Sequence, residues 1–516
     1  MKKLVLLLVV VLTLIPLFHP GLFDVHDPTS IVRFFTLHET LAAGQFPAAW
    51  TNLLNQGFGY PLFLYYAPVF SYLGVILKFI TPSYLVALKL AIGLVVLVAA
   101  LGMYRLMRLS LGSLASLLSA VAYTLLPYHA LTIYVRGAYA EGVTWALLPW
   151  ILFLWRIPKR GKRWIALTSV VTSLFFLSHN SLPFAFLPFI FLWIILHWQK
   201  NWRVTLLPLV LTLGLTAWFL VPVLFEHGFV QAEKIAEMTV YSDHFLYPEQ
   251  LWNSPWGYGG SAPMGQPDGM SFMLGKFQLV LAVLSVVGAT ILKKWDRRLF
   301  FFTAVLLFYG WMTTYLSAPI WSLFKGLAIL QFPWRLLAFA SFGVAAVSGY
   351  LLDFLPKKLR LPSLLLIVGG LLFFNLKFFT PQSYLPMTDN NFLNSTVLAT
   401  VARDKIPEYL PVTMPDFPLV SKTDNLVRTS ISASGQLTNS VEQPVTLTTA
   451  YMPEWALYLD GTKMKIKPNQ SGSITTVNPV LAGTHPAKLV WVRTSLENWS
   501  LVISTVSLLV VIGLCL

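Results

Sequence analysis

Long apolar runs alternate with short polar segments along most of this chain. A helix that crosses a bilayer needs roughly 17 to 25 mostly apolar residues, and the runs that reach this length predict about twelve transmembrane helices. The first run, LVLLLVVVLTLIPLF after Lys2 and Lys3, has no small-residue cleavage pattern, so we expect an uncleaved helix. The later runs lie near residues 88–108, 111–127, 141–156, 163–178, 183–197, 204–222, 277–292, 299–316, 335–353, 361–379 and 499–516.

The positions of the basic residues predict how these helices are oriented. Lys and Arg accumulate in the cytoplasmic loops of membrane proteins. Every basic cluster falls on the side of the N-terminus if these runs cross the membrane and the segment 61–80 does not. We therefore expect a cytoplasmic N-terminus, and we expect 61–80, which contains Pro61 and Pro68, to form a re-entrant or interfacial helix on the outer face. The clusters are Lys2 and Lys3; Arg105 and Arg108; Arg156, Lys159, Arg160, Lys162 and Arg163; Lys200 and Arg203; Lys293, Lys294, Arg297 and Arg298; and Lys357, Lys358 and Arg360.

This orientation places the long loops 19–87 and 223–276 on the extracytoplasmic side, together with the block 380–498. In that block polar and apolar residues alternate with period two, which is typical of antiparallel strands. Its clearest hairpin is WALYL-DG-TKMKI, where Asp460 and Gly461 suit the positive φ angles of a type I′ turn. About 120 residues can bury an independent core. We therefore expect a small β-sandwich that either caps the outer cavity or binds a sugar or acceptor.

The predicted fold is a polytopic α-helical membrane protein with a C-terminal extracytoplasmic β-sandwich-like domain. The membrane domain is expected at residues 1–379, the β-rich domain at 380–498 and a C-terminal transmembrane helix at 499–516. The cell membrane is therefore the predicted location.

Composition agrees with this location. Only 11% of the 516 residues are charged, 56% are apolar, and the mean hydropathy is +0.68. Soluble domains carry about 25% charged residues, so a soluble enzyme and a disordered chain are both excluded. The single cysteine, Cys515, excludes a disulfide scaffold. The net charge of +15 lies in short clusters between apolar runs, so it reflects topology and predicts no nucleic-acid partner.

The first outer loop carries the acidic residues closest to the first helix, in the stretch GLFDVHDPTS. Asp27 before Pro28 suits a helix N-cap followed by a first-turn proline. Asp27 equally suits a general base towards an acceptor hydroxyl, or a ligand of a divalent cation together with Asp24 and His26. The sequence leaves these roles open.

A second group of polar residues occupies the predicted outer ends of the helices. Arg136 and Glu141 in YVRGAYAEG are not at i, i+4 spacing, so we expect two groups aimed across a turn. Arg136 is suited to phosphate because its planar guanidinium donates two parallel hydrogen bonds. A structural ion pair between Arg136 and Glu141 is the alternative. His179 ends another helix, where it is either a helix-end residue or a substrate contact.

Two later segments complete the candidate residues for substrate binding. Asp243 and His244 add a carboxylate and an imidazole in the large middle loop. Gln331, Trp334 and Arg335 lie in LQFPWR at the outer start of a membrane run, where the positive-inside rule would not place an Arg. An anionic partner for Arg335, in the protein or in a ligand, is therefore predicted. The chain has no P-loop and no G-x-S-x-G motif, so neither chemistry is indicated.

Several motifs together resemble a known family. They are GQFPAAW at 44–50, GFGYPLF at 57–63, YVRGAYAEG, LSHN at 177–180, the DHF loop, LQFPWR and WALYLDG. They resemble the bacterial membrane proteins described as 6-pyruvoyl-tetrahydropterin synthase-related, over nearly the whole chain. The soluble synthase uses three histidines to bind zinc, and this sequence has no H-x-H pair, so no pterin chemistry is carried over.

The architecture also resembles the GT-C superfamily of polytopic glycosyltransferases, which take sugars from polyprenyl-phosphate carriers. That resemblance implies that Asp27 is the catalytic carboxylate, with Asp24 as the second candidate. Pro28 stands where the commonest GT-C pattern has a second acidic residue, which leaves the need for a divalent cation open.

The resemblance and the residues together suggest a membrane glycosyltransferase. Arg136 or Arg335 would bind the donor phosphate, and Trp334, Tyr134 and Tyr60 would supply aromatic surfaces for the sugar and the isoprenoid. The alternative is a non-catalytic lipid-linked saccharide binding protein or transporter of the cell envelope. Transporters place polar groups or helix breaks near the bilayer midplane, whereas here the charged residues gather near the helix ends.

The orientation can be tested by thiol labelling in intact cells. Cysteines introduced at Lys162 and Arg297 should be shielded from an impermeant thiol reagent, and a cysteine at Asn469 should react. Labelling at position 162 from outside would contradict the predicted orientation.

Overall fold

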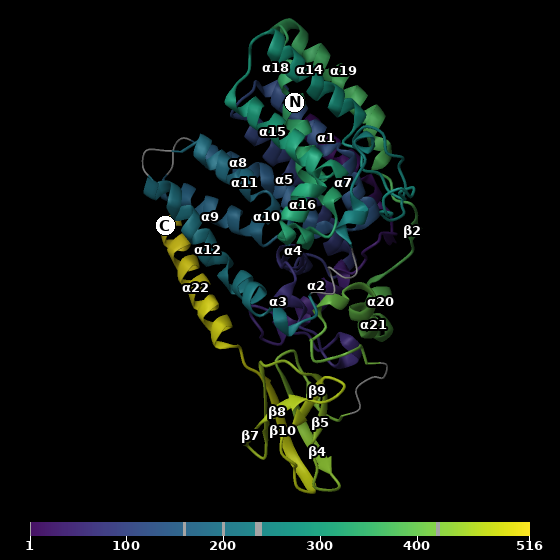
Figure 1. Ribbon diagram of the computed structural model, residues 1–516, viewed down its shortest axis with the longest axis vertical. Coiled ribbons are helices and arrows are strands. Elements are labelled where there is room, and N and C mark those ends of the chain that lie inside the picture. The colour runs from purple at the N-terminus through teal and green to yellow at the C-terminus, as the bar shows by residue number, and fades with distance from the viewer. Residues whose placement is uncertain (1, 158–160, 199–201, 233–239, 419–423) are drawn as a thin grey trace.

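The computed structural model describes residues 2–157, 161–198, 202–232, 240–418 and 424–516. Helices form a large body, and most strands gather in a β region at one end of it (Figure 1). Three residues of the predicted basic clusters, Lys159, Arg160 and Lys200, lie outside the described residues.

A helix lies at each of the predicted membrane runs, as expected for a helical membrane protein. Six described helical stretches are long and apolar enough to cross a membrane: Tyr84–Arg108, Ser113–Arg136, Val204–Phe225, Pro333–Phe354, Lys357–Phe378 and Ser495–Cys515. The helices of the body are α1 (Lys2–Thr13), α5 (Tyr84–Arg108), α6 (Ser113–Thr124), α7 (Pro127–Leu131), α8 (Tyr139–Arg156), α9 (Lys162–Phe176), α10 (Leu182–Ala185), α11 (Leu187–Leu196), α12 (Trp202–Phe225), α14 (Lys276–Ile291), α15 (Arg297–Met312), α16 (Ala318–Leu323), α17 (Leu337–Ser348), α18 (Tyr350–Phe354), α19 (Lys357–Asn375) and α22 (Ser495–Cys515).

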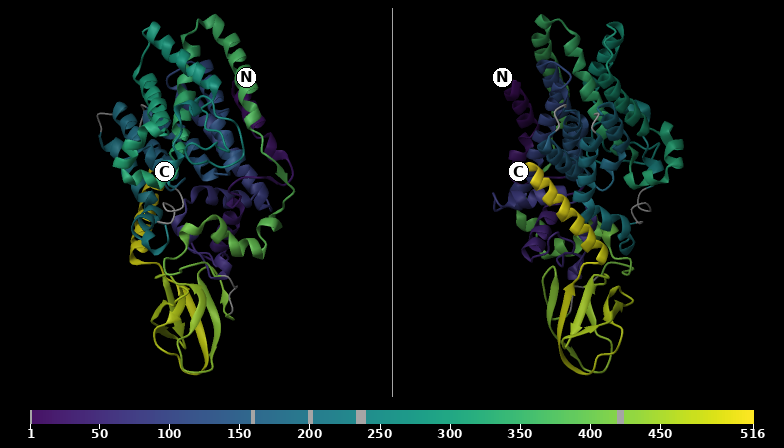
Figure 2. Two further views of the ribbon diagram at one scale, coloured as in Figure 1. Left: turned by 45° about the vertical axis from the view of Figure 1, so that its right-hand side comes forward. Right: turned by 90° about the vertical axis from the view of Figure 1, so that its left-hand side faces the viewer.

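The helices differ in how much of their surface is buried. Helix α17 is buried along its whole length and packs against α14 and α15, so it forms the centre of the body. Helix α22 is mostly exposed and runs along the outside of the body from the β region towards the C-terminus (Figure 2). Small residues let α22 approach α12, because Ser504 Oγ donates to the Gly214 carbonyl at 2.7 Å and a Cβ on Gly214 would lie 2.0 Å from Ser507 Oγ.

Basic residues from distant predicted clusters meet within the body. Lys2, Lys3, Arg105 and Arg108 line one cavity of about 750 Å³. Arg156 and Arg298 both donate to the Leu109 carbonyl, one residue after Arg108. The N-terminus lies in the upper part of the body, far from the β region (Figure 1).

Residues 61–80 form two short helices rather than one. They are α3 (Leu62–Tyr65) and α4 (Val69–Lys78), and α4 packs against α5 and against α2 (Ser30–Ala42). Pro68 explains the break, because the residue before a proline is disfavoured in helical geometry and Pro68 itself is the N-cap of α4.

The β region contains two antiparallel sheets. Their strand orders are β3-β4-β10-β6-β7 and β5-β9-β8. The predicted hairpin is confirmed: β6 and β7 pair across Asp460 and Gly461, whose φ angles are 49° and 80°. The strands are β3 (Val427–Arg428), β4 (Ser432–Asn439), β5 (Thr446–Ala450), β6 (Trp455–Leu459), β7 (Thr462–Met464), β8 (Ile466–Pro468), β9 (Ser473–Thr476) and β10 (Gly483–Trp491).

The sheets begin later than the predicted boundary at residue 380. Between residue 380 and β3, the described residues form the two-residue strand β2 (Tyr384–Leu385), the helices α20 (Asp389–Phe392) and α21 (Ser395–Lys405), and a 3₁₀ helix (Pro407–Tyr409). Helix α21 follows from its local sequence: Asn394 Oδ1 accepts the Val397 N–H, and Val401 and Ala402 are buried one turn further on. The period-two pattern applies from Val427 onward.

The first outer loop is attached to this C-terminal part. Strand β1 (Leu22–Phe23) pairs with β2, and Trp50 contacts both Trp455 and Trp491 in the β region, with ring centroids 5.4 Å and 5.2 Å apart. The loop therefore lies between the helical body and the β region, which fixes its position on both sides.

Candidate functional site

Two backbone hydrogen bonds place the first outer loop against the end of a body helix. The His26 N–H donates to the Val135 carbonyl at 3.0 Å, and the Asp27 N–H donates to the Arg136 carbonyl at 3.1 Å. The helix that begins as α7 widens into a π-helical turn over Thr132–Arg136 and ends at Gly137, where φ is +66°. A Cβ on Gly137 would lie 2.7 Å from the Asp27 carbonyl oxygen, so glycine is required both for the φ angle and for the close approach.

The Asp27 side chain is held by two partners. Its Oδ2 accepts from Arg33 Nη1 at 3.1 Å, and its Oδ1 accepts from the Thr29 N–H at 3.0 Å and from the Thr29 hydroxyl. Burial alone would raise the pKa of Asp27, but the Arg33 guanidinium and the Thr29 hydrogen bonds hold this pKa below its usual range. The carboxylate is therefore ionised, and 37% of its side chain remains exposed.

The predicted N-cap role of Asp27 is displaced along the chain. Helix α2 begins at Ser30 with Thr29 as its N-cap, so Asp27 organises the turn before the helix instead of capping it. Arg33 was missed by the sequence analysis. The signal was a lone Arg in the run IVRFF, and in the structure Arg33 is 5% exposed with its guanidinium 4.2 Å from the centre of the Tyr66 ring.

Arg136 and Glu141 lie across the Gly137 turn and form a buried ion pair, which was the alternative left open by the sequence. Arg136 Nη2 lies 2.9 Å from Glu141 Oε2, and the Glu141 side chain has no exposed surface. The Tyr128 hydroxyl donates to the other carboxylate oxygen of Glu141, and Arg136 Nη1 approaches that hydroxyl at 3.4 Å. The Arg136 guanidinium also stacks 4.6 Å from the Trp334 ring. The Glu141 carboxylate therefore neutralises the charge of Arg136 and would compete with a phosphate for its guanidinium.

Arg335 differs from Arg33 and Arg136 because it forms no ion pair with a carboxylate of the described residues. Its Nη1 donates to the Leu330 carbonyl at 3.0 Å, and its guanidinium lies 5.3 Å from the Phe332 ring. Its Nε is buried and has no hydrogen-bond partner. Arg335 therefore carries a positive charge that has no ion-pair partner among the described residues. It lies near the Arg136 and Glu141 pair, and its charge acts on the Glu141 carboxylate.

His179 is a neutral imidazole in this environment. Its Nδ1 accepts from the Ser181 and Leu182 N–H groups at 3.2 and 3.3 Å, which places the ring proton on Nε2. Burial, together with the nearby Arg335 charge, lowers the pKa of His179 to about 3. His179 therefore supplies a hydrogen-bond donor and no charge at neutral pH.

Trp334 and His244 meet through Ser261. The Trp334 Nε1–H donates to Ser261 Oγ at 3.2 Å, and His244 Nδ1 lies 2.9 Å from the same oxygen. The ring of Phe332 stacks on Trp334 with centroids 4.8 Å apart. The large middle loop therefore packs against the LQFPWR segment, in which Gln331 has a positive φ of 63°.

Glu408 is a second carboxylate near Asp27 that sequence reasoning missed. It lies in a short 3₁₀ helix, Pro407–Tyr409, between α21 and the β region. Burial raises the pKa of Glu408, while Arg33 acts in the opposite direction and Asp27 raises it further. The side chain of Tyr66 lies within electrostatic range of all four charged members of this group: Asp27, Arg33, Arg335 and Glu408.

Other predicted residues lie outside this group. The residues Asp24 and Asp243 are exposed at the surface. Tyr60 and Tyr134 are fully buried and donate their hydroxyls to the carbonyls of Ile406 and Thr13, so their rings do not face a cavity.

The predicted grouping of Asp24, His26 and Asp27 around one cation is not formed, because His26 Nε2 contacts the Tyr258 carbonyl at 2.9 Å and Asp27 faces Arg33. Among the described residues, the one group of three carboxylate or imidazole side chains close enough to share an ion is Glu226, Glu454 and Glu497.

An apolar groove of about 580 Å³ lies among the helices of the body. Side chains of α4, α5, α8, α9, α12 and α22 line it, among them Val69, Tyr72 and Val143. Helix α8 also carries Glu141 of the charged group, two residues before Val143, and α4 packs against α8 through Phe70 and Tyr139. The groove and the charged group therefore share helix α8.

Comparison with known proteins gives two findings. The family described as "6-pyruvoyl-tetrahydropterin synthase related domain; membrane protein" matches residues 63–380, which include Arg136, Glu141, His179 and Arg335 but not Asp27. Among solved structures, the arabinofuranosyltransferase AftD from Mycobacteria is similar at 15% identity and a TM-score of 0.49, over 77% of this chain and 28% of that one.

A mutant of AftD is similar at 15% identity and a TM-score of 0.50, over 77% of this chain and 30% of that one. At this identity the likeness concerns the fold, and the chain spans less than a third of the length of AftD. None of the curated proteins matches this sequence.

The neutral state of His179 predicts a pH-dependent stability difference. The pKa of His179 is about 3 in the folded protein and about 6.5 in the unfolded chain. The unfolded chain therefore binds a proton that the folded protein does not, and stability present above pH 6.5 is lost as the pH falls towards 3. At about pH 5.5 this loss should be about 1.4 kcal/mol relative to His179→Asn, which keeps an acceptor for the two amides.

The measurement is the difference in Tm between wild type and His179→Asn over a pH series. The wild type should lose stability faster on acidification. A difference that stays constant across the series would contradict a buried neutral His179.

Proposed function

This chain belongs to the 6-pyruvoyl-tetrahydropterin synthase-related family of membrane proteins, and we propose that it is a membrane glycosyltransferase that moves a sugar from a polyprenyl-phosphate donor to an extracytoplasmic acceptor. The fold shared with the AftD mutant structure supports this proposal, since AftD is described as an arabinofuranosyltransferase. The sugar and the acceptor are not specified by the proposal.

The observation that carries the proposal is the charge pattern around Arg335. Arg33 and Arg136 each face a carboxylate, whereas Arg335 faces none among the described residues. Arg335 is partly buried, with a buried Nε that has no hydrogen-bond partner, and a guanidinium without a counter-charge in such a place is stabilised by an approaching anion. A phosphate is a suitable anion because the planar guanidinium can donate two parallel hydrogen bonds to it.

The apolar groove supports a lipid-linked donor. An isoprenoid chain is a hydrocarbon, and burying it against apolar side chains is favourable by about 25 cal/mol per Å². The proposal places this chain in the groove beside α4 and α8, with its phosphate at Arg335.

Asp27 is the proposed base in this reaction. The acceptor hydroxyl oxygen attacks the anomeric carbon of the sugar and loses its proton to the Asp27 carboxylate. The bond between the anomeric carbon and the phosphate oxygen breaks, and its electron pair leaves with the polyprenyl phosphate. Arg335, with Arg136 beside it, stabilises the negative charge that develops on this leaving group. Glu408 is a second carboxylate on which the charges of Arg33 and Arg335 act, so the roles of Asp27 and Glu408 must be compared experimentally.

The proposal includes an orientation for the molecule. The basic residues near Lys2, Arg105, Arg156 and Arg298 would face the cytoplasm, and the charged group around Asp27, together with the β region, would face outward. About twelve helices would then cross the membrane, in addition to the short helices α3 and α4 on the outer side.

Replacing Asp27 by Asn should reduce sugar transfer by at least about 100-fold, because the amide cannot accept the acceptor proton. Expression and membrane insertion should be retained, since the amide oxygen can still accept from the Thr29 N–H or from Arg33, but Tm should fall because Arg33 loses its counter-charge. Asp24→Asn is the matched control, because Asp24 lies in the same loop and is exposed, and this variant should keep near wild-type activity.

The variant Glu408→Gln distinguishes the two carboxylates. It should retain substantial activity if Asp27 is the base. Loss of activity in Glu408→Gln with retention in Asp27→Asn would move the base to Glu408 and contradict the proposed role of Asp27.

Replacing Arg335 by Lys should weaken donor binding by roughly 1.5 to 3 kcal/mol, because the charge is kept but the paired hydrogen bonds are lost. Donor affinity and Tm should both be measured on this variant. A lower Tm with unchanged donor affinity would assign Arg335 a purely structural role through Leu330 and Phe332.

A further inference from the structure

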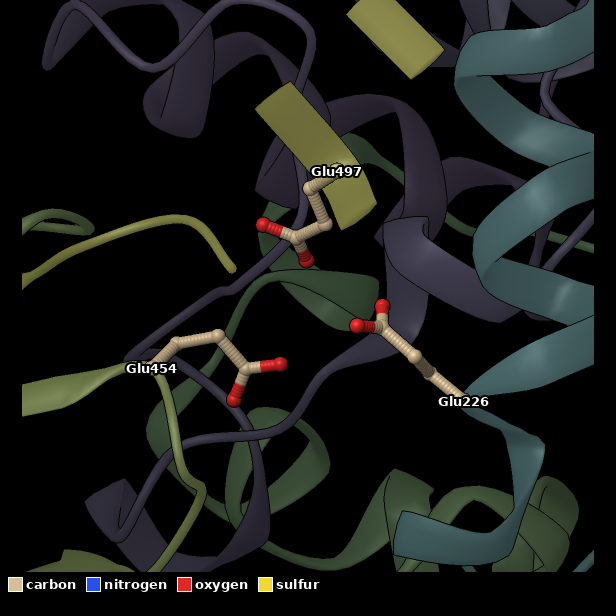
Figure 3. A group of neighbouring side chains, drawn as sticks. All are labelled: Glu226, Glu454 and Glu497. Atoms are coloured by element: carbon tan, nitrogen blue, oxygen red, sulfur yellow. The ribbon is translucent and has the colours of Figure 1, made fainter. Parts of the chain in front are cut away.

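Three glutamates converge where the β region meets the helical body, away from the Asp27 group. Glu226 directly follows α12, Glu454 directly precedes β6, and Glu497 lies in the first turn of α22. Figure 3 shows their carboxylates pointing towards one another. One oxygen from each lies within 4.8 Å of the other two.

All three side chains are buried. Their exposed fractions are 7% for Glu226, 1% for Glu454 and 4% for Glu497. The Glu226 carboxylate accepts from the Thr494 hydroxyl at 2.7 Å, and the Glu497 carboxylate accepts from the Thr494 N–H at 3.3 Å. These bonds use one oxygen of each carboxylate, since Glu226 Oε2 and Glu497 Oε1 have no hydrogen-bond partner.

Glu454 gives the strongest indication of a missing partner. Both of its carboxylate oxygens are buried without any hydrogen bond, and its side chain is aimed into the group. Arg493 lies nearby in sequence, but its guanidinium donates to the Pro47 carbonyl at 2.9 Å. None of the ion pairs formed by the described residues involves any of these three glutamates.

Three buried carboxylates at this separation repel one another strongly in a medium of low dielectric constant. A cation at the centre of the group would remove the repulsion and would satisfy the unpartnered oxygens together.

We propose that Glu226, Glu454 and Glu497 bind a calcium ion that joins the β region to the helical body. The ligands are all carboxylate oxygens, which favours a hard divalent cation over zinc or copper. Ca²⁺ takes about six to eight oxygen ligands in flexible geometry, whereas Mg²⁺ keeps several waters and is usually bound by one or two carboxylates. Three carboxylates that each place an oxygen within 4.8 Å of the other two therefore favour calcium.

The position of the three ligands explains what the ion would do. Glu226 ends one body helix, Glu497 begins the C-terminal helix, and Glu454 belongs to the sheet that contains the β6 and β7 hairpin. A shared ion would fix the angle between these elements and therefore the position of the β region against the first outer loop. Trp50 of that loop also contacts the β region, through Trp455.

The test uses the full-length protein, purified in detergent and stripped of metals with a chelator. Calcium at millimolar concentration should raise Tm by several degrees, and calorimetric titration should show a single saturable calcium site. Magnesium at the same concentration should raise Tm less. An equal response to magnesium would contradict the choice of calcium.

Two variants identify the ligands. Glu454→Gln should abolish the calcium-induced rise in Tm, and without calcium this variant should be at least as stable as the wild type because the substitution removes repulsion. Glu442→Gln is the control, since Glu442 is an exposed glutamate of the same β region and its loss should leave the calcium response intact.

A wild type that neither binds calcium in the titration nor gains stability from it would overturn the proposal. A Glu454→Gln protein that responds to calcium as the Glu442→Gln control does would overturn it as well. If Glu454→Gln does not fold, the wild-type titration decides the question alone.

Discussion

The close backbone contact between Asp27 and the Arg136–Gly137 turn determines the geometry of the whole candidate site. It joins the first outer loop to the end of a body helix by two hydrogen bonds, and it requires a glycine at position 137. This contact brings the backbone that carries Asp27 next to the backbone that carries Arg136 and Glu141. Asp27 then pairs with Arg33, and Arg136 pairs with Glu141, whereas Arg335 forms no ion pair among the described residues.

The paired and unpaired arginines have different physical roles. Arg33 and Arg136 are buried against carboxylates, where the removal of one partner would leave an uncompensated charge. They therefore stabilise the fold around the site and set its field. The Arg335 guanidinium donates to a carbonyl and lies near an aromatic ring, but it forms no ion pair with a carboxylate of the described residues. It is therefore the arginine to which the proposal assigns the donor phosphate.

The sequence predicted the elements better than their contacts. Apolar runs located the helices because each run is a local property of the chain, and the Asp460-Gly461 turn located the hairpin for the same reason. The pairing of Arg136 with Glu141 was one of two alternatives that the sequence left open, since the two residues are close along the chain on either side of Gly137. Arg33, Glu408 and the three glutamates were missed because their significance depends on partners far away in sequence. Glu226 and Glu454, for example, meet only after the β region docks on the body. Pro68 was noted in the sequence, but the break it causes between α3 and α4 became evident only in the structure.

The central claim is that a lipid phosphate binds at Arg335 with its hydrocarbon chain in the groove beside α4 and α8. The most direct measurement is a cryo-electron microscopy structure of the protein with an added polyprenyl phosphate. The account predicts phosphate density within hydrogen-bonding distance of the Arg335 guanidinium, continuous with lipid density along Val69 and Val143. Density for the lipid phosphate at another part of the surface, with Arg335 still bonded to the Leu330 carbonyl, would contradict it.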